Sequence, residues 1–456
     1  MKTVKESIRY RLKDGYSIFQ DAVLDNSDGR AKGRQGLLCG TLSLHFLRNL
    51  ISGTYFTGLL LAMDADDIYI GYITMIMTMC TFFQMFAPLY LEKMKRRKTL
   101  LLVIHSIYHF LNIVVVGVIP LMPWPKETIL NVFMITVFLL SVTNALGAPG
   151  FSDWHMQSLP YERRISYWTV QNLTSQILGV CIAYIAGLFL DFFVDNRIAF
   201  GGISPTLTAL LLLRILAVIL AACEIYFYTW IKEYPYEKNI REKNDHGMRL
   251  LLLPLKNKAY IMTVSIQVLW TFIGGVIGPY FSVYLLDEVK MSYSFLALGG
   301  FISTPIILIM TPIWGKMLQR KRWINLLAMV MAGYSLVYLL NPLITSSTQF
   351  LYPVVILVSN FFSPCISVAL GHLSYMKMPE QNRTAYISLF SVLVQGASLL
   401  GTFVGTQFIA HTEDKVLNLF GFTMVNKQYL NLIQFALALC LVFYVRKIAK
   451  TIQEEK

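Results

Sequence analysis

The first apolar stretch of the chain carries a row of polar side chains. His45, Arg48, Asn49, Ser52 and Tyr55 occupy positions i, i+3, i+4, i+7 and i+10, which share one face of a helix. A guanidinium inside an apolar helix costs about 3 kcal/mol unless it faces a cavity or a partner. Its planar fork of donors matches carboxylate and phosphate groups. The row therefore predicts a binding site for an anionic or polar ligand, with every member except Ser52 in contact with it.

Other ionisable side chains lie in apolar stretches of the first half of the chain. Arg48 and Arg214 would both lie about 14–16 Å into a ~30 Å hydrocarbon core. A structural role for Arg48, held by helix carbonyls or by Glu224, is the alternative to ligand binding. His105 and His109 are one helical turn apart, but we find no third ligand that converges on them, so we expect buried hydrogen bonds and no metal site. Glu224 lies close to the end of its stretch, where it can reach the interface.

Neutral amide and aromatic side chains occur in the other apolar stretches. Amides suit polar recognition and rings suit stacking, although each such group alone more often bonds to a neighbouring helix. As a set, they complete the predicted binding site: Asn144, Gln267, Trp270, Asn360 and Gln395.

These residues need long apolar elements to position them. The chain is 55% hydrophobic and only 14% charged, and stretches of ~20 apolar residues cross a bilayer as helices. The predicted fold class is therefore an all-α integral membrane protein with twelve transmembrane helices. We place them at residues 37–62, 68–91, 99–122, 128–151, 165–190, 205–231, 259–286, 294–315, 323–343, 350–376, 385–410 and 428–445.

Positive charges occur in alternate connections between these stretches. Most of the 39 Lys and Arg residues lie in 1–36, 92–98, 232–258, three shorter loops and the end of the chain, whereas the intervening loops are acidic. By the positive-inside rule, both termini are cytoplasmic and the number of spans is even. The net charge of +13 then reflects topology and anionic lipids, and we expect no nucleic-acid partner because no segment is long enough for a soluble binding domain.

The 232–258 segment separates two similar halves. Residues 88–97 align with 312–321, and residues 159–167 align with 378–386. We therefore predict a cytoplasmic tail (1–36), a six-helix bundle (37–231), a cytoplasmic linker (232–258), a second six-helix bundle (259–445) and a cytoplasmic tail (446–456).

Six-span repeats across a basic central loop resemble the major facilitator transporters. That family carries a Gly-x-x-x-Asp-Arg-x-Gly-Arg-Arg motif between its second and third spans. The matching positions 88–97 of this chain keep the acid, Glu92, and the final basic pair, but they lack both glycines. The resemblance implies alternating access, with Glu92 as a latch and Arg96, Arg164 and Arg383 as further gating residues. The alternative is that 92–98 only determines topology.

The resemblance and the charged residues together predict a secondary active transporter for a small anionic or polar organic solute. In this family, spans 1, 4, 7 and 10 line the central cavity, which would bring Arg48 to the solute. A multidrug/proton efflux transporter and a flippase for lipid-like substrates are the alternatives. We do not expect an enzyme, because the cluster of Asp153, His155 and Glu162 lies in a loop too short to build a pocket.

The remaining expectations concern partners and location. We expect a monomer that meets membrane lipids and a coupling proton or ion, with His45 as the titrating residue, and no cofactor. The six cysteines show no CxxC spacing, and the N-terminus is polar and basic, so we expect neither disulfides nor a cleaved signal peptide. Short loops without an outer Asn-X-Ser/Thr sequon favour a bacterial inner membrane.

Overall fold

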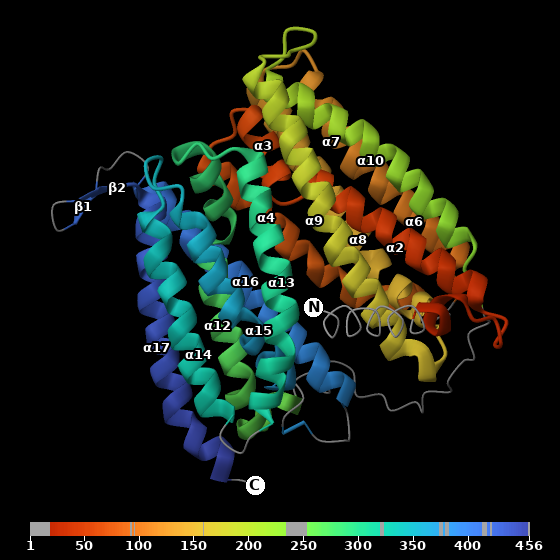
Figure 1. The fold of residues 1–456 in the computed structure, drawn as a ribbon, viewed down its shortest axis with the longest axis vertical. Helices are drawn as coiled ribbons and strands as arrows, with labels where there is room; N and C mark the ends of the chain where they lie inside the picture. Colours follow the sequence, from red (N-terminus) through yellow and green to blue (C-terminus); the bar gives the residue numbers. More distant parts are fainter. Residues whose placement is uncertain are drawn as a thin grey trace, which may run out of the picture. The chain divides into compact units, whose positions relative to one another are not determined.

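The computed structural model describes residues 19–91, 94, 96–157, 159–233, 253–319, 323–373, 377–378, 383–412, 417–419 and 422–454. Nearly all of them form helices, which confirms the all-α class (Figure 1). The exception in this part of the chain is a short antiparallel hairpin of β1 (Leu417–Leu419) and β2 (Phe422–Met424).

Eleven helical segments in the described ranges are long and apolar enough to cross a membrane. They correspond to eleven of the twelve predicted stretches. They are Asp67–Phe86, Lys98–Leu121, Lys126–Met156, Ser166–Asp195, Pro205–Thr229, Lys258–Glu288, Tyr293–Leu318, Trp323–Leu343, Leu351–Leu373, Leu389–Thr412 and Asn426–Ala449.

The stretch predicted at 37–62 differs, because it forms two helices. Helix α2 (Ala31–Ile51) starts before the predicted stretch, and α3 (Thr54–Ala62) follows a break. At the break, Ser52 is extended and Gly53 has φ +61°, a left-handed conformation that glycine adopts without a steric penalty. The twelve-span count and the cytoplasmic termini therefore stay predictions.

Contacts divide the chain into two compact units, which we describe separately. The first unit is Met1–Leu59 with Phe83–Asn239, and the second is Leu60–Phe82 with Ile240–Lys456. The first contains, besides α2, η1 (Gln20–Leu24), α5 (Ala87–Leu91), α6 (Lys98–His109), η3 (Phe110–Val115), α7 (Val116–Val118), η4 (Ile119–Leu121), α8 (Lys126–Gln157), η5 (Tyr161–Arg163), α9 (Arg164–Asp195) and α10 (Pro205–Thr229).

The second unit contains the other long helices. These are α4 (Asp67–Cys80), α12 (Lys258–Val283), α13 (Tyr293–Leu318), α14 (Trp323–Leu340), α15 (Leu351–Leu373), α16 (Arg383–Thr412) and α17 (Asn426–Glu454). Short segments join or extend them: η6 (Leu253–Lys256), η7 (Tyr284–Glu288) and η8 (Asn341–Leu343), while η2 (Thr81–Phe86) continues α4 across the boundary between the units.

Small residues permit the closest helix contacts in each unit. In the first unit, a Cβ on Gly40 of α2 would overlap the Tyr228 ring of α10. In the second unit, a Cβ on Gly405 of α16 would overlap the carbonyl oxygen of Val276 on α12. Helices in lipid associate through such close packing, since apolar side chains gain nothing by leaving one apolar medium for another.

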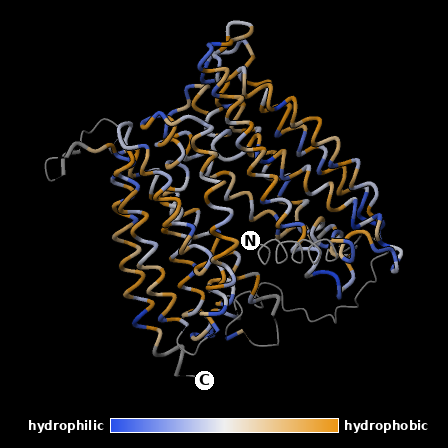
Figure 2. The backbone as a smooth tube through the Cα atoms, in the orientation of Figure 1, coloured by the Kyte–Doolittle hydropathy of each residue, from blue (hydrophilic) through white to orange (hydrophobic). Residues whose placement is uncertain are grey.

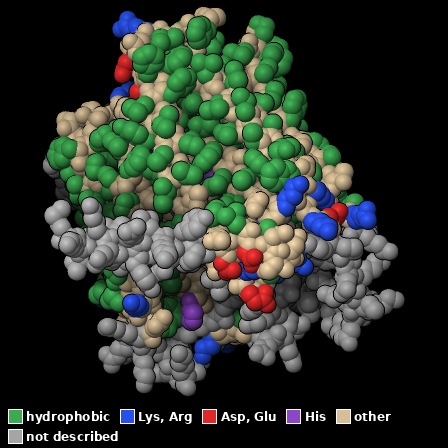
Figure 3. Space-filling view, turned by 45° about the vertical axis from the view of Figure 1, so that its right-hand side comes forward, with side chains coloured by type: hydrophobic (Ala, Val, Ile, Leu, Met, Phe, Trp, Pro, Cys, Tyr) green, Lys and Arg blue, Asp and Glu red, His purple; other side chains and the backbone are tan. Residues whose placement is uncertain are grey.

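Apolar side chains cover the outside of the long helices. Figure 2 shows hydrophobic residues along the helices and hydrophilic residues mainly near their ends. The upper part of the face in Figure 3 is largely hydrophobic, and most Lys and Arg side chains lie below it. Exposed residues such as Ile185 and Phe443, at 64% and 68% accessibility, need a lipid environment. The chain is a multi-pass membrane protein.

Candidate functional site

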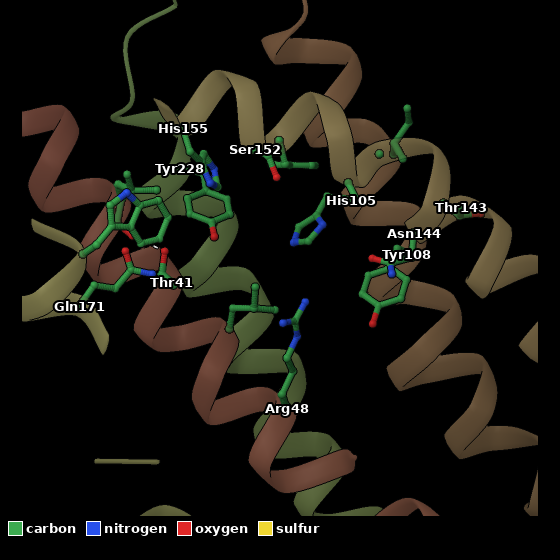
Figure 4. Close-up of a pocket in the computed structure, with 17 residues that line it drawn as sticks. Thr41, Arg48, His105, Tyr108, Thr143, Asn144, Ser152, His155, Gln171 and Tyr228 are labelled. Atoms are coloured by element: carbon green, nitrogen blue, oxygen red, sulfur yellow. Dashed lines mark hydrogen bonds between the residues drawn. The ribbon is translucent and has the colours of Figure 1, made fainter. Parts of the chain in front are cut away.

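The first unit contains a cavity of about 250 Å³ between α2, α6, α8, α9 and α10 (Figure 4). Its apolar wall includes Phe151 and Trp168. Its polar lining is formed by Thr41, Arg48, His105, Tyr108, Thr143, Asn144, Ser152, His155, Gln171 and Tyr228.

Two predicted binding residues of the first half, Arg48 and Asn144, line this cavity. Arg48 lies on α2, and its guanidinium points into the cavity (Figure 4). Asn144 lies on α8, across the cavity from α2. Among the described residues, no carboxylate lies within 4.0 Å of the Arg48 guanidinium, so Glu224 does not hold it there.

The other members of the predicted row do not line the cavity. The side-chain amide of Asn49 donates to the carbonyl of His45 at 2.9 Å and lies against Gly179 of α9. Tyr55 is buried, and its hydroxyl donates to the carbonyl of Ala183 at 2.6 Å. The break after α2 explains why Tyr55 does not line the cavity. The helical periodicity that would place it on the same face as Arg48 does not continue past Ile51.

Two cavity atoms outside the predicted binding set have no hydrogen-bond partner among the described residues. They are Nε2 of His155 and Oε1 of Gln171, and both are buried. Leaving a buried polar atom without a partner costs about 1–3 kcal/mol, so these atoms are available to a solute or to water. The two residues come from different helices, α8 and α9, so no local spacing in the sequence relates them.

A second cavity, of about 430 Å³, lies within the second unit between α12, α14 and α15. Gln267, Trp270 and Tyr334 line it. The rings of Trp270 and Tyr334 pack edge to face, with their centroids 5.4 Å apart. Oε1 of Gln267 is buried without a partner in the described part of the chain. This cavity therefore also presents an acceptor beside aromatic rings.

Asn360 and Gln395 lie outside both cavities. The Asn360 amide donates to the Ser303 hydroxyl at 2.8 Å and to the carbonyl of Ile356 at 2.9 Å, so it joins α15 to α13. Gln395 is half-buried on α16. Of the neutral residues in the predicted set, the structure thus brings Asn144 to one cavity and Gln267 and Trp270 to the other.

The structure corrects the prediction for Glu224 and the histidines of α6. Glu224 is fully buried and does not reach an interface. Its carboxylate oxygens lie 2.7 Å from His105 Nε2 and 2.8 Å from His109 Nε2. The expected buried hydrogen bonds are confirmed. The statement that no third ligand converges on the two histidines is wrong, because Glu224 comes from α10, 115 residues from His109 along the chain.

The predicted gating residues lie at chain segments that are only partly described. Glu92 and the side chain of Arg383 lie outside the described residues. Arg96 is exposed, and Arg164 donates through Nε to the carbonyl of Leu159 at 3.0 Å. The neighbour of Arg96, Arg97, instead forms an ion pair with Asp153 at 3.1 Å.

Arg163 makes contacts that the sequence did not indicate. Its guanidinium donates to the carboxylate of Asp25 and to the hydroxyl of Ser27, 138 and 136 residues away. Hydrogen bonds from Arg163 and Ser27 lower the pKa of Asp25 from its ordinary value to about 2. The segment before α2 is therefore attached to the start of α9.

The long apolar helices, with a cavity in each unit, are those of an all-α membrane protein. The sequence model of the Major Facilitator Superfamily matches residues 37–402, and the chain belongs to this family. Family and fold indicate a transporter and not an enzyme.

Solved structures share the fold at low sequence identity. A point mutant of the nucleoside transporter NupG is 13% identical with a TM-score of 0.68, over 91% of this chain and 99% of that chain. A D-xylose–proton symporter is 13% identical with a TM-score of 0.61, over 91% and 97%. A bacterial homologue of the iron transporter ferroportin, in an inward-facing state, is 15% identical with a TM-score of 0.62, over 91% and 98%. A search of curated proteins found no match.

Proposed function

We propose that this protein is a secondary active transporter that moves a small anionic or polar organic solute across the cell membrane by alternating access. The observation that carries the proposal is the position of Arg48. Its guanidinium points into a cavity of the first unit and has no carboxylate partner among the described residues. An anionic group of the solute would supply that partner.

The energetics of an arginine within the membrane support this role. A charged guanidinium at membrane depth is retained mainly where it meets water, a partner or a substrate. A structural arginine would be satisfied by protein groups, as Arg214 is by the carbonyl of Asn112 at 2.7 Å. Arg48 instead keeps its donors towards open space, which suits a fork-like contact with a carboxylate or phosphate oxygen pair.

The rest of the cavity fits a polar solute with an apolar part. Asn144, His155 and Gln171 present amide and imidazole groups, while Trp168 and Tyr108 present rings. We propose that Asn144 and Gln171 bond to neutral polar groups of the solute. Within the cavity of the second unit, Gln267 and Trp270 are the proposed polar and aromatic contacts for a solute. Asn49, Tyr55 and Asn360 bond within or between helices. His45 and Gln395 lie outside both cavities, and we assign none of these residues a solute contact.

Uptake by proteoliposomes tests the proposal. The wild-type protein and its Arg48→Gln variant would be supplied with radiolabelled compounds sorted by charge. We expect selective uptake of anionic compounds, with KM raised about 10- to 100-fold in the variant, because a hydrogen bond to a charged group contributes about 1.5–3 kcal/mol. Arg197→Gln is the matched control, since Arg197 is exposed and lies outside the cavity.

Three outcomes would contradict the proposal. Equal uptake of anions by wild type and by Arg48→Gln would remove Arg48 from the binding site. Export of hydrophobic cations that survives in the variant would favour a multidrug/proton efflux transporter, and movement of labelled lipids without uptake of soluble anions would favour a flippase.

A further inference from the structure

We propose that His105, His109 and Glu224 form a binding site for a divalent transition-metal ion within the first unit. The two histidines lie one turn apart on α6, and Glu224 lies on α10. The two Nε2 atoms are 3.0 Å apart, and each is within 2.8 Å of one oxygen of the same carboxylate. The two Nε2 atoms and a carboxylate oxygen, from two helices, thus lie within 4.8 Å of one another. This inference does not depend on the identity of the transported solute.

The spacing of the three donor atoms suits a small dication. Ligands at about 2.0–2.1 Å from a tetrahedral zinc ion are separated from one another by about 3.3 Å. The two Nε2 atoms, 3.0 Å apart, need to separate by only about 0.3 Å. Each Nε2 atom contacts a different oxygen of the Glu224 carboxylate, at 2.7 and 2.8 Å, so rotation of the carboxylate would present one oxygen as the third ligand. Both imidazoles already turn the same nitrogen, Nε2, towards the carboxylate.

The three proposed ligands are buried, so the negative charge of Glu224 needs a positive charge close to it. Glu224 is fully buried, and His105 and His109 are 9% and 4% exposed. A carboxylate inside a membrane protein needs a compensating charge, and no Lys or Arg pairs with Glu224 in the described part of the chain. A bound dication would compensate the carboxylate and would use the imidazole lone pairs as ligands. Two imidazoles and one carboxylate favour ions such as Zn²⁺, Fe²⁺ or Co²⁺ over Mg²⁺ or Ca²⁺.

The surrounding helices fix the positions of the ligands. The π-helical segment η3 begins directly after His109, and Arg214 of α10 donates to the carbonyl of Asn112 within it at 2.7 Å. This contact, three residues after His109, ties the segment that continues α6 to α10, the helix of Glu224. Single-turn π-helical insertions occur frequently at functional sites.

One ligand of the cluster lines the cavity, which is the route that we propose for an ion. His105 lines the cavity that also contains Arg48, and Figure 4 shows its ring directed towards that open space. With three protein ligands, a tetrahedral ion keeps one position for water or for a group that enters the cavity. His155 also lines this cavity but is not among the three converging ligands, so it provides a matched control.

Metal titration of the purified protein tests the site. The full chain, carrying an affinity tag without histidines and stripped with EDTA, would be titrated with Co²⁺ by visible absorption and with Zn²⁺ by competition against a chromophoric chelator. We expect one saturable site per chain. His109→Gln and Glu224→Gln should each weaken binding about 100-fold or more, since each removes one of three ligands. His155→Gln should bind as the wild type does.

The change of Tm on adding Zn²⁺ is a second measurement, which also reports whether each variant is folded. Zn²⁺ at about 100 times its dissociation constant should raise the Tm of the wild-type protein, and this rise should be lost in His109→Gln. The proposal is wrong if the wild-type protein binds no Co²⁺ or Zn²⁺ at about 100 µM, the weakest affinity that would count as a specific site. It is also wrong if a folded His109→Gln protein binds with unchanged affinity.

Discussion

Arg48 and Arg214 lie at similar depths in their apolar stretches, yet their guanidinium groups have different surroundings. Arg48 points into the cavity of the first unit. Arg214 is 4% exposed and donates to the carbonyl of Asn112, which lies in the π-helical segment η3 where the regular helical bonding pattern is interrupted. Residue type and depth are the same, so the different roles follow from the helices that face each side chain.

Lys427 is a buried cation of the second unit and supports a prediction about stability. It is 3% exposed, and its Nζ lies 2.7 Å from Asp67 and 3.2 Å from Glu288. Lys427→Met would leave both carboxylates without this partner. We expect the free energy of unfolding to fall by about 2 kcal/mol, between the values for exposed and buried ion pairs. Thermal unfolding in detergent measures the change.

Lys290→Met is the control for this prediction. Lys290 also pairs with an acid, Asp287, at 2.8 Å, but its side chain is 71% exposed. Because solvent screens that pair, the change should be under about 1 kcal/mol. Equal losses of stability in the two variants would show that burial of Lys427 does not strengthen its contacts.

Among the elements, helices α12 and α16 approach each other closely at glycines. A Cβ on Gly275 of α12 would lie 2.7 Å from the carbonyl oxygen of Ser398 on α16, whereas nothing lies within 4 Å of a Cβ on the adjacent Gly274. Gly275→Ala should therefore force the two helices apart and lower stability by about 1–3 kcal/mol. The midpoint of thermal unfolding in detergent reports the change.

Gly274→Ala provides a control one residue away on the same helix. It adds the same methyl group to open space and should be neutral or stabilising by up to about 1 kcal/mol, since alanine is the better helix former. If the two variants lost stability equally, the close approach of α16 would not be the cause of the loss at Gly275.

At the scale of the whole molecule, the side of the membrane on which each terminus lies tests the predicted number of spans. Twelve spans put both termini in the cytoplasm, and the first span would then consist of α2 and α3 joined at Ser52 and Gly53. Alkaline phosphatase joined after Asp64 or after Arg197 should be active. The same enzyme joined after Lys232 or after Lys456 should be inactive, because both positions would be cytoplasmic.

Specific results would contradict this topology. An inactive fusion after Asp64 would mean that α2 and α3 do not cross the membrane, leaving the eleven segments that meet the length and composition criteria. An active fusion after Lys456, with an inactive one after Lys232, would mean an odd number of crossings in the second half. A green fluorescent protein fused at the C-terminus should fluoresce only if that end is cytoplasmic.

The sequence by itself determined the fold class and eleven of the membrane helices. Apolar runs of about 20 residues have few stable alternatives to a helix in lipid, since every backbone amide must be bonded within its own segment. The sequence prediction differs from the structure in the first span, where the helix is broken at Ser52 and Gly53. Gly53 adopts a left-handed conformation there, and the distribution of apolar residues through 37–62 does not predict such a turn.

Only the tertiary structure decided which polar residues meet. Arg48 and Asn144 line one cavity, while Asn49 and Tyr55, from the same predicted row as Arg48, bond to carbonyls of helices instead. Glu224 reaches His105 across 119 residues of chain. Helical periodicity defines which side chains share a face, but the helix that covers this face depends on packing of the whole bundle, which no local pattern encodes.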